Sequence, residues 1–207
     1  MLTITIVAVL AILLAIVLKE MFKKAKPEVK PVEDLASAKI TEARAGDSVS
    51  VSGAGDQFSD LDMVVENRNQ YEVGQRRWIE LRGAYREHRA LVEVWAGDEL
   101  EVSVVPDAKR ITLEDVGLSE EDLSQLDERQ NTADNFEYEG KTWYYLFSRE
   151  FVLLRDAQSQ GTNFYGWVFR EDGDARTMLI RKAEGEGFAA FVGARVNPDD
   201  ITVYRAG

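Results

Sequence analysis

The segment RALVEVWAGDELEVSVV, residues 89–105, decides the fold class of this chain. Two runs rich in valine and leucine, with polar residues between the apolar ones, flank the dipeptide Gly97-Asp98. Apolar and polar residues that alternate are typical of a strand with one buried face, and a glycine next to an aspartate favours a tight turn. The segment therefore predicts an antiparallel hairpin.

Two further segments have the same character. YGWVFREDGDARTMLIRK, residues 165–182, turns at Asp172-Gly173, and FEYEGKTWYYLF, residues 136–147, turns at Glu139-Gly140. Within the body that follows residue 39, helical signal occurs in one place, LSEEDLSQLDERQ at residues 118–130, where Ser119 is a good N-cap before several acids. The sequence therefore predicts a mainly β, antiparallel body with one short connecting helix.

The two sides of this helix resemble each other. Trp78 and Trp167 are each followed by a hairpin, then by Pro-Asp and by Ile-Thr, at nearly the same spacing. This order favours a duplicated β unit, although turn residues alone can imitate it. We expect two related β-meander units that close into small barrels or one sandwich. The expected parts are a first β unit at 40–116, a helical connector at 117–133 and a second β unit at 134–207.

The N-terminal segment is apolar. Residues 1–18 carry no charge, and a helix of that length spans about 27 Å, close to the hydrocarbon thickness of a bilayer. We expect a single transmembrane helix at residues 1–22 and a basic, proline-containing tether at 23–39. Four lysines after the apolar run would meet anionic lipid headgroups: Lys19, Lys23, Lys24 and Lys26.

The same lysines favour an orientation. Positive charge stays on the cytoplasmic side, which predicts a single-pass protein of the cell inner membrane, with its N-terminus out and its β body in the cytoplasm. The sequence leaves two alternatives open: export with the body outside, and a helix buried in a soluble core.

Composition limits the chemistry. The net charge of −12 makes nucleic acid an improbable partner, and the absence of cysteine excludes thiolate metal sites and cysteine nucleophiles. The single histidine, His88, lies in a charged run and is expected at an exposed loop or strand end. EDGD at 171–174 and NPDD at 197–200 lack the spacing of a calcium loop. We therefore predict no catalytic residue, no metal site and no cofactor.

Strand alternation gives one candidate surface. Residues i and i+2 share a face, so Trp78 lies beside Glu80 and Arg82, and Trp95 lies beside Glu93. An indole next to a carboxylate can recognise a cation or form part of a protein interface. Trp78, Glu80, Glu93 and Trp95 are therefore the candidate partner or cation surface. The alternative is that both indoles belong to the core.

Several of these segments resemble a bacterial family catalogued as domain of unknown function 4178. The resemblance rests on RRWIELRG, RALVEVWAGDELEVSVV, FEYEGKTWYYLFSRE, NFYGWVFREDGD and NPDDITVYR, and it covers roughly residues 40–205. It implies no catalytic activity. It implies an association with small membrane proteins, with spermidine-synthase-like enzymes and with proteins of the phage-shock type.

The leading function hypothesis is a non-enzymatic, membrane-tethered cytoplasmic adaptor or sensor in an envelope-stress or polyamine-linked system. Its partners would be the bilayer, through residues 1–18, and a membrane or cytoplasmic protein. The second hypothesis is a binding domain for a cationic, polyamine-like small molecule. The third is an enzyme that uses carboxylates.

Overall fold

The computed structural model describes residues 38–206, except residues 75, 157, 159 and 174. The predicted transmembrane helix at 1–22, most of the tether, and Lys19, Lys23, Lys24 and Lys26 lie outside the described residues. Within the described part of the chain, every helix is too short or too polar to cross a membrane.

In the residues that the structure describes, eleven strands form one antiparallel sheet, and few helices accompany them. The strands are β1 (Ser48–Val51), β2 (Leu61–Val73), β3 (Arg76–Tyr85), β4 (His88–Ala96), β5 (Leu100–Val105), β6 (Asn135–Tyr138), β7 (Lys141–Leu154), β8 (Thr162–Glu171), β9 (Arg176–Ala183), β10 (Ala189–Val196) and β11 (Ile201–Tyr204). The helices are α2 (Leu113–Val116) and α3 (Glu120–Arg129), with short 3-10 turns η1 (Ile40–Glu42), η2 (Asp56–Phe58) and η3 (Pro198–Asp200). The predicted mainly β, antiparallel body is confirmed.

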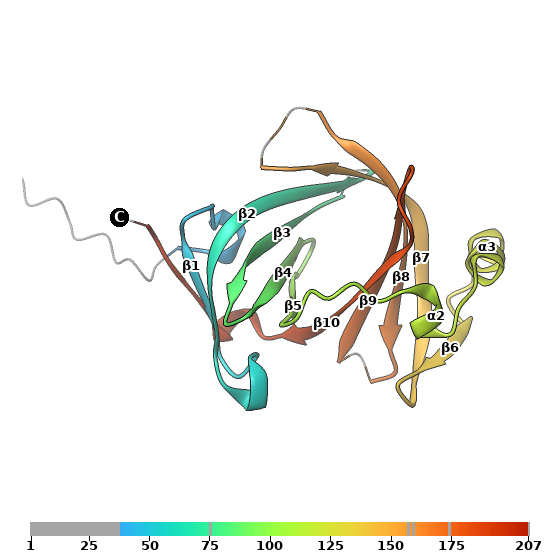
Figure 1. Ribbon diagram of the computed structural model, residues 1–207, viewed down its shortest axis with the longest axis horizontal. Helices are drawn as coiled ribbons and strands as arrows, with labels where there is room; N and C mark the ends of the chain where they lie inside the picture. The colour runs from blue at the N-terminus through green and yellow to red at the C-terminus, as the bar shows by residue number, and fades with distance from the viewer. Residues whose placement is uncertain (1–37, 75, 157, 159, 174, 207) are drawn as a thin grey trace, which may run out of the picture. The chain divides into compact units, whose positions relative to one another are not determined.

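Eight of the strands close into a barrel. Strands β2 to β5 form one meander and β7 to β10 form another, in the order β2-β3-β4-β5-β10-β9-β8-β7. The ring closes because β2 also pairs with β7, through Tyr71 opposite Leu153 (Figure 1). The two meanders therefore complete one barrel together, which corrects the expectation of two small barrels or a sandwich.

The two meanders correspond strand by strand. The first strand of each is long, with 13 residues in β2 and 14 in β7, and each contains a bulge against its neighbour, at Val65/Asn67 and at Tyr145/Phe147. The strand that follows has 10 residues in both. A duplicated unit would produce this pattern, and the duplication itself stays a prediction.

The turn predictions hold in detail. The hairpin at Gly97-Asp98 joins β4 to β5, with Ala96 opposite Leu100. The turns at Glu139-Gly140 and Asp172-Gly173 join β6 to β7 and β8 to β9. Ser119 caps α3 as expected, but α2, which Thr112 caps, was not predicted as a separate helix. The C-terminal β11 returns to pair with β1, so the second unit does not stay apart from the first.

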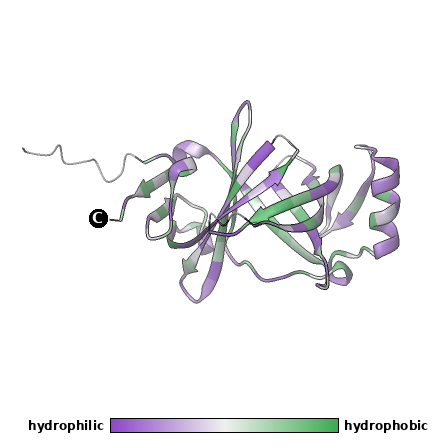
Figure 2. Cartoon of the chain, turned by 90° about the horizontal axis from the view of Figure 1, so that it is seen from above, coloured by the Kyte–Doolittle hydropathy of each residue, from purple (hydrophilic) through white to green (hydrophobic). Residues whose placement is uncertain are grey.

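Apolar side chains form three clusters. One cluster fills the barrel and includes Tyr71, Trp78, Phe151 and Phe164. A second joins β1 and η1 to strands β2 to β5, and a third packs α2 and α3 against strands β7 to β10. Figure 2 shows hydrophobic residues concentrated along the strands, while α3 is largely hydrophilic. The barrel wall is thus packed with apolar side chains on both its inner and its outer face.

Candidate binding cavity

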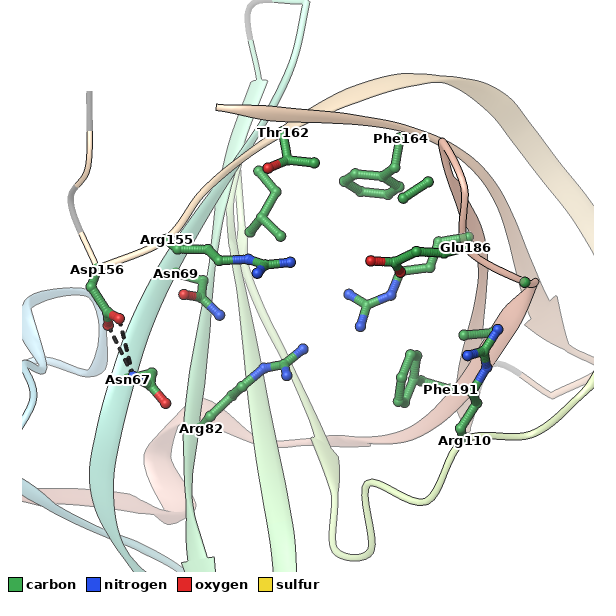
Figure 3. Close-up of a pocket in the computed structure, with 15 residues that line it drawn as sticks. Asn67, Asn69, Arg82, Arg110, Arg155, Asp156, Thr162, Phe164, Glu186 and Phe191 are labelled. Carbon is green, nitrogen blue, oxygen red and sulfur yellow. Dashed lines mark hydrogen bonds between the residues drawn. The ribbon is translucent and has the colours of Figure 1, made fainter. Parts of the chain in front are cut away.

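One end of the barrel contains a cavity of about 370 Å³. Its walls come from both meanders and from the β9–β10 turn, and Figure 3 shows polar side chains pointing into the enclosed space from several directions. The side chains that matter for its chemistry are Asn69, Arg82, Arg110, Leu153, Arg155, Asp156, Phe164, Arg181, Glu186 and Phe191. The volume lies in the range of about 300–1,000 Å³ that is usual for small-molecule sites.

Glu80 anchors the polar network beneath this cavity. It is only 1% exposed, and its carboxylate accepts hydrogen bonds from Asn69 Nδ2 at 2.8 Å, Arg82 Nε at 2.5 Å and Tyr71 OH at 2.8 Å. Burial alone would raise the pKa of Glu80, but the hydrogen bond and charge of Arg82 outweigh it and hold that pKa below its ordinary value. Glu80 is therefore an ionised, fully partnered carboxylate.

Arg181 completes the network from the second meander. Its Nη1 donates to Tyr71 OH at 2.7 Å and lies 3.9 Å from Glu80 Oε2. Its guanidinium also lies over the Phe191 ring, 4.6 Å from the centroid. One carboxylate thus orients two guanidinium groups, and each retains further N–H donors, because Arg82 uses only Nε and Arg181 only Nη1 in these contacts.

Two more arginines belong to the rim of the cavity. Arg110 donates from Nε and Nη2 to the carbonyl oxygen of Phe188, which fixes its side chain on the β9–β10 turn. Among the described residues, the Arg155 side chain has no hydrogen bond and no ion pair. In Figure 3, Arg155 and Arg82 extend into the enclosed space.

Two carboxylates share the rim. Asp156 accepts from Asn67 Nδ2 at 3.1 Å and from the Arg68 backbone N–H at 3.2 Å, so it is held to the side of β2. Glu186 faces the space opposite Arg155 (Figure 3). The walls therefore carry four arginines against two carboxylates, in a chain whose net charge is −12.

An aromatic stack closes the barrel below the network. Trp78 lies between Tyr71, at 4.5 Å between centroids, and Trp95, at 4.1 Å, and both contacts are stacked. Phe151 meets Trp78 edge-on. The indole Nε1 of Trp78 is buried, and no residue in the described part of the chain accepts a hydrogen bond from it. The stack belongs to the core cluster inside the barrel, and two members of that cluster, Leu153 and Phe164, also line the cavity.

The predicted partner or cation surface takes a different position from the one expected. Alternation did place Trp78, Glu80, Glu93 and Trp95 on one face, but that face is the interior of the barrel. Trp78 is 1%, Glu80 1% and Glu93 6% exposed, and Trp95 is half-buried. The surface prediction is wrong for the first three, because closure of the ring covers their face. The alternative that assigned the indoles to the core describes Trp78, but it did not foresee that Glu80 and Glu93 are buried as well.

The cavity arginines were missed as a group. Alternation did put Arg82 on the face of Trp78, but Arg110, Arg155 and Arg181 come from segments whose proximity depends on the closure of the ring. One sequence signal could have pointed to Arg181: strand alternation places it on the same face of the second hairpin as Leu179. His88 is exposed at the start of β4, as expected.

Comparison of the chain with protein-family models, with curated proteins and with solved structures gives no match. The resemblance to domain of unknown function 4178 therefore stays a prediction.

Proposed function

We propose that the β body is a non-enzymatic sensor module that binds a small molecule in the cavity at the end of its barrel. An eight-stranded barrel is wide enough either to be filled by side chains or to hold one small ligand. In this chain the aromatic stack fills the middle, and polar groups converge on the space above it. That convergence on a volume of about 370 Å³ is the observation that carries the proposal.

The proposal keeps the membrane tether and the cytoplasmic body predicted from residues 1–39. When a metabolite binds, the mouth of the tethered barrel changes, and a membrane partner detects that change. The adaptor hypothesis is therefore kept: contact with the partner is how the sensor passes on its signal. An envelope-stress or polyamine-linked setting comes only from the family resemblance.

Two other hypotheses lose support. A polyamine-like cation would need several carboxylates to bind it. Glu80 already has four neighbouring donors, and Glu186 lines the cavity together with four arginines. Glu93, whose pKa burial raises to about 7, is the residue that favours the enzyme hypothesis. It lies outside the set of side chains that line the cavity, so it has no substrate position to serve.

The test is a thermal-shift screen of small molecules against the full chain, kept in non-ionic detergent because residues 1–18 are apolar. Ala183→Trp, on the cavity wall, should abolish every shift by filling the space. Ala96→Trp, at the exposed end of β4, is the matched control and should keep the shifts. If no compound acts, or if both variants respond like the parent chain, the cavity is not a ligand site.

The predicted topology has its own measurement. The chain has no cysteine, so a single Gly207→Cys variant carries the only thiol. Protection from an impermeant thiol reagent in intact cells is expected for a cytoplasmic body. Labelling in intact cells would place the body outside.

A further inference from the structure

We propose that the ligand of this cavity is a small organic anion, with a phosphate or carboxylate group bound by the arginines and an apolar body packed on the aromatic wall. This inference rests on the proposed function, because it names the chemical class that the sensor recognises.

The guanidinium groups of Arg82 and Arg181 are held in place by the protein itself, without a ligand. Glu80 fixes Arg82 through a bond of 2.5 Å and holds Arg181 through Tyr71, so neither guanidinium must be ordered on binding. Hydrogen bonds from a charged guanidinium to an anionic oxygen are short and about twice as strong as neutral ones. A rigid pair of donors at the base of a cavity is therefore suited to a group with two or three acceptor oxygens.

Arg155 supplies a positive charge that no described residue neutralises. Its side chain has no hydrogen bond or ion pair among the described residues, and it extends over the cavity from the end of β7. Arg82 and Arg181 share one carboxylate, so that group of three retains one net positive charge. An anion placed between them and Arg155 would meet positive charge on two sides.

The apolar part of the ligand has a place as well. Phe164 and Leu153 form one wall, and Phe191 forms the opposite one beneath Arg181. The guanidinium of Arg181 already covers one face of the Phe191 ring, so that ring face is not open for a ligand cation. The wall therefore suits a flat or aliphatic body, and the four arginines of the lining suit a negatively charged end.

Four probes of nearly equal size separate the contributions of charge and of shape: phenyl phosphate, benzoate, benzyl alcohol and benzylammonium. Each is titrated calorimetrically into the full chain in non-ionic detergent, at low ionic strength because salt screens exposed charges. We expect saturable binding of one or both anions, binding of benzyl alcohol at least about tenfold weaker, and no binding of benzylammonium. The better of the two anions identifies the acidic group.

Arg155→Gln provides the test of position. The residue is exposed and has no described partner to leave unpaired, so the variant should fold normally while its affinity for the anion falls at least about tenfold. Arg77→Gln is the matched control, because it removes the same charge from an exposed side chain outside the cavity, and it should leave the affinity unchanged.

The failures are distinguishable. If benzyl alcohol or benzylammonium binds as well as the anions, and Ala183→Trp abolishes that binding, the cavity is a ligand site and the anion inference is wrong. If anions bind but Arg155→Gln and Arg77→Gln weaken them equally, the attraction is a general charge effect and the inference is also wrong. If no small molecule in the screen responds to Ala183→Trp, the proposed function itself fails.

Discussion

Glu80 and Glu93 lie directly opposite each other on β3 and β4, inside the barrel, yet only Glu80 is held by arginines. The two carboxylates therefore have opposite titration behaviour. Hydrogen bonds from Arg82 and Asn69 lower the pKa of Glu80 against the effect of burial, whereas burial and the nearby Glu80 charge raise the pKa of Glu93 to about 7. Because Glu80 is the ionised carboxylate that holds Arg82 and Arg181, the base of the cavity has ordered, positively charged donors.

The raised pKa of Glu93 predicts a pH dependence of stability. Its ordinary value is 4.5, so between about pH 4.5 and 7 the folded chain keeps a proton that the unfolded chain has lost. The folded state therefore loses stability as the pH rises through that interval. Glu93→Gln, which stays neutral, should gain on the parent chain across it, by up to about 3 kcal/mol in the free energy of unfolding.

Urea unfolding of both chains at pH 5, 6, 7 and 8 measures this difference. Glu80 does not disturb the comparison, because its lowered pKa places its own loss of stability below this range. The exposed Glu128→Gln is the control, with no pH-dependent gain expected. A Glu93→Gln difference that stays constant from pH 5 to 8 would contradict the burial argument.

Trp78 gives a prediction about packing. Trp78→Ala should destabilise the fold by about 3–5 kcal/mol, because it removes the centre of the aromatic stack. Trp78→Phe should cost less than half of that, since it keeps a ring and removes a buried N–H that has no acceptor among the described residues. Chemical denaturation of the two variants checks the ratio, and equal costs would show that the indole nitrogen is satisfied in solution.

A substitution at Gly166 tests whether the interior of the closed barrel is tightly packed. A Cβ atom at this position in β8 would lie 2.4 Å from Cε2 of Phe151, a ring that is 0% exposed. Gly166→Ala should therefore cost about 1–3 kcal/mol through overpacking. Gly97→Ala, in the exposed β4–β5 turn, has its nearest neighbour at 3.7 Å and should be almost neutral. Thermal unfolding that ranks the two variants equally would argue against this interior.

The hairpins could be predicted from the sequence, because each depends on residues that are neighbours in the chain. Gly97-Asp98 and Asp172-Gly173 fix their turns, and alternation assigns Trp78 and Glu80 to one face. Alternation does not say which face is inward, because that depends on the pairing of β2 with β7, and Gln70 and Leu154 are far apart in the chain. The cavity arginines come together only after that pairing, which is why an acid-bearing surface was predicted instead of an arginine-lined cavity.

Removal of the Glu186 charge should strengthen the binding of an anion in the cavity. It faces the enclosed space from the β9–β10 turn, and like charge near a bound anion weakens the complex. Glu186→Gln should therefore bind the preferred anionic probe several-fold more tightly at low salt, with the difference reduced at high salt. Glu184→Gln, on the same turn but outside the lining residues, is the control and should change little. Equal affinities for the parent chain and Glu186→Gln would place the anion elsewhere.

The most direct measurement of the central claim is a titration of the isotope-labelled full chain with phenyl phosphate, followed by nuclear magnetic resonance of the backbone amides. The account predicts that the shifts cluster at Arg82, Arg155, Arg181 and Phe191, and that Arg155→Gln reduces them all. Shifts that cluster on another surface, or that match those produced by benzylammonium, would contradict an anion site in the barrel mouth.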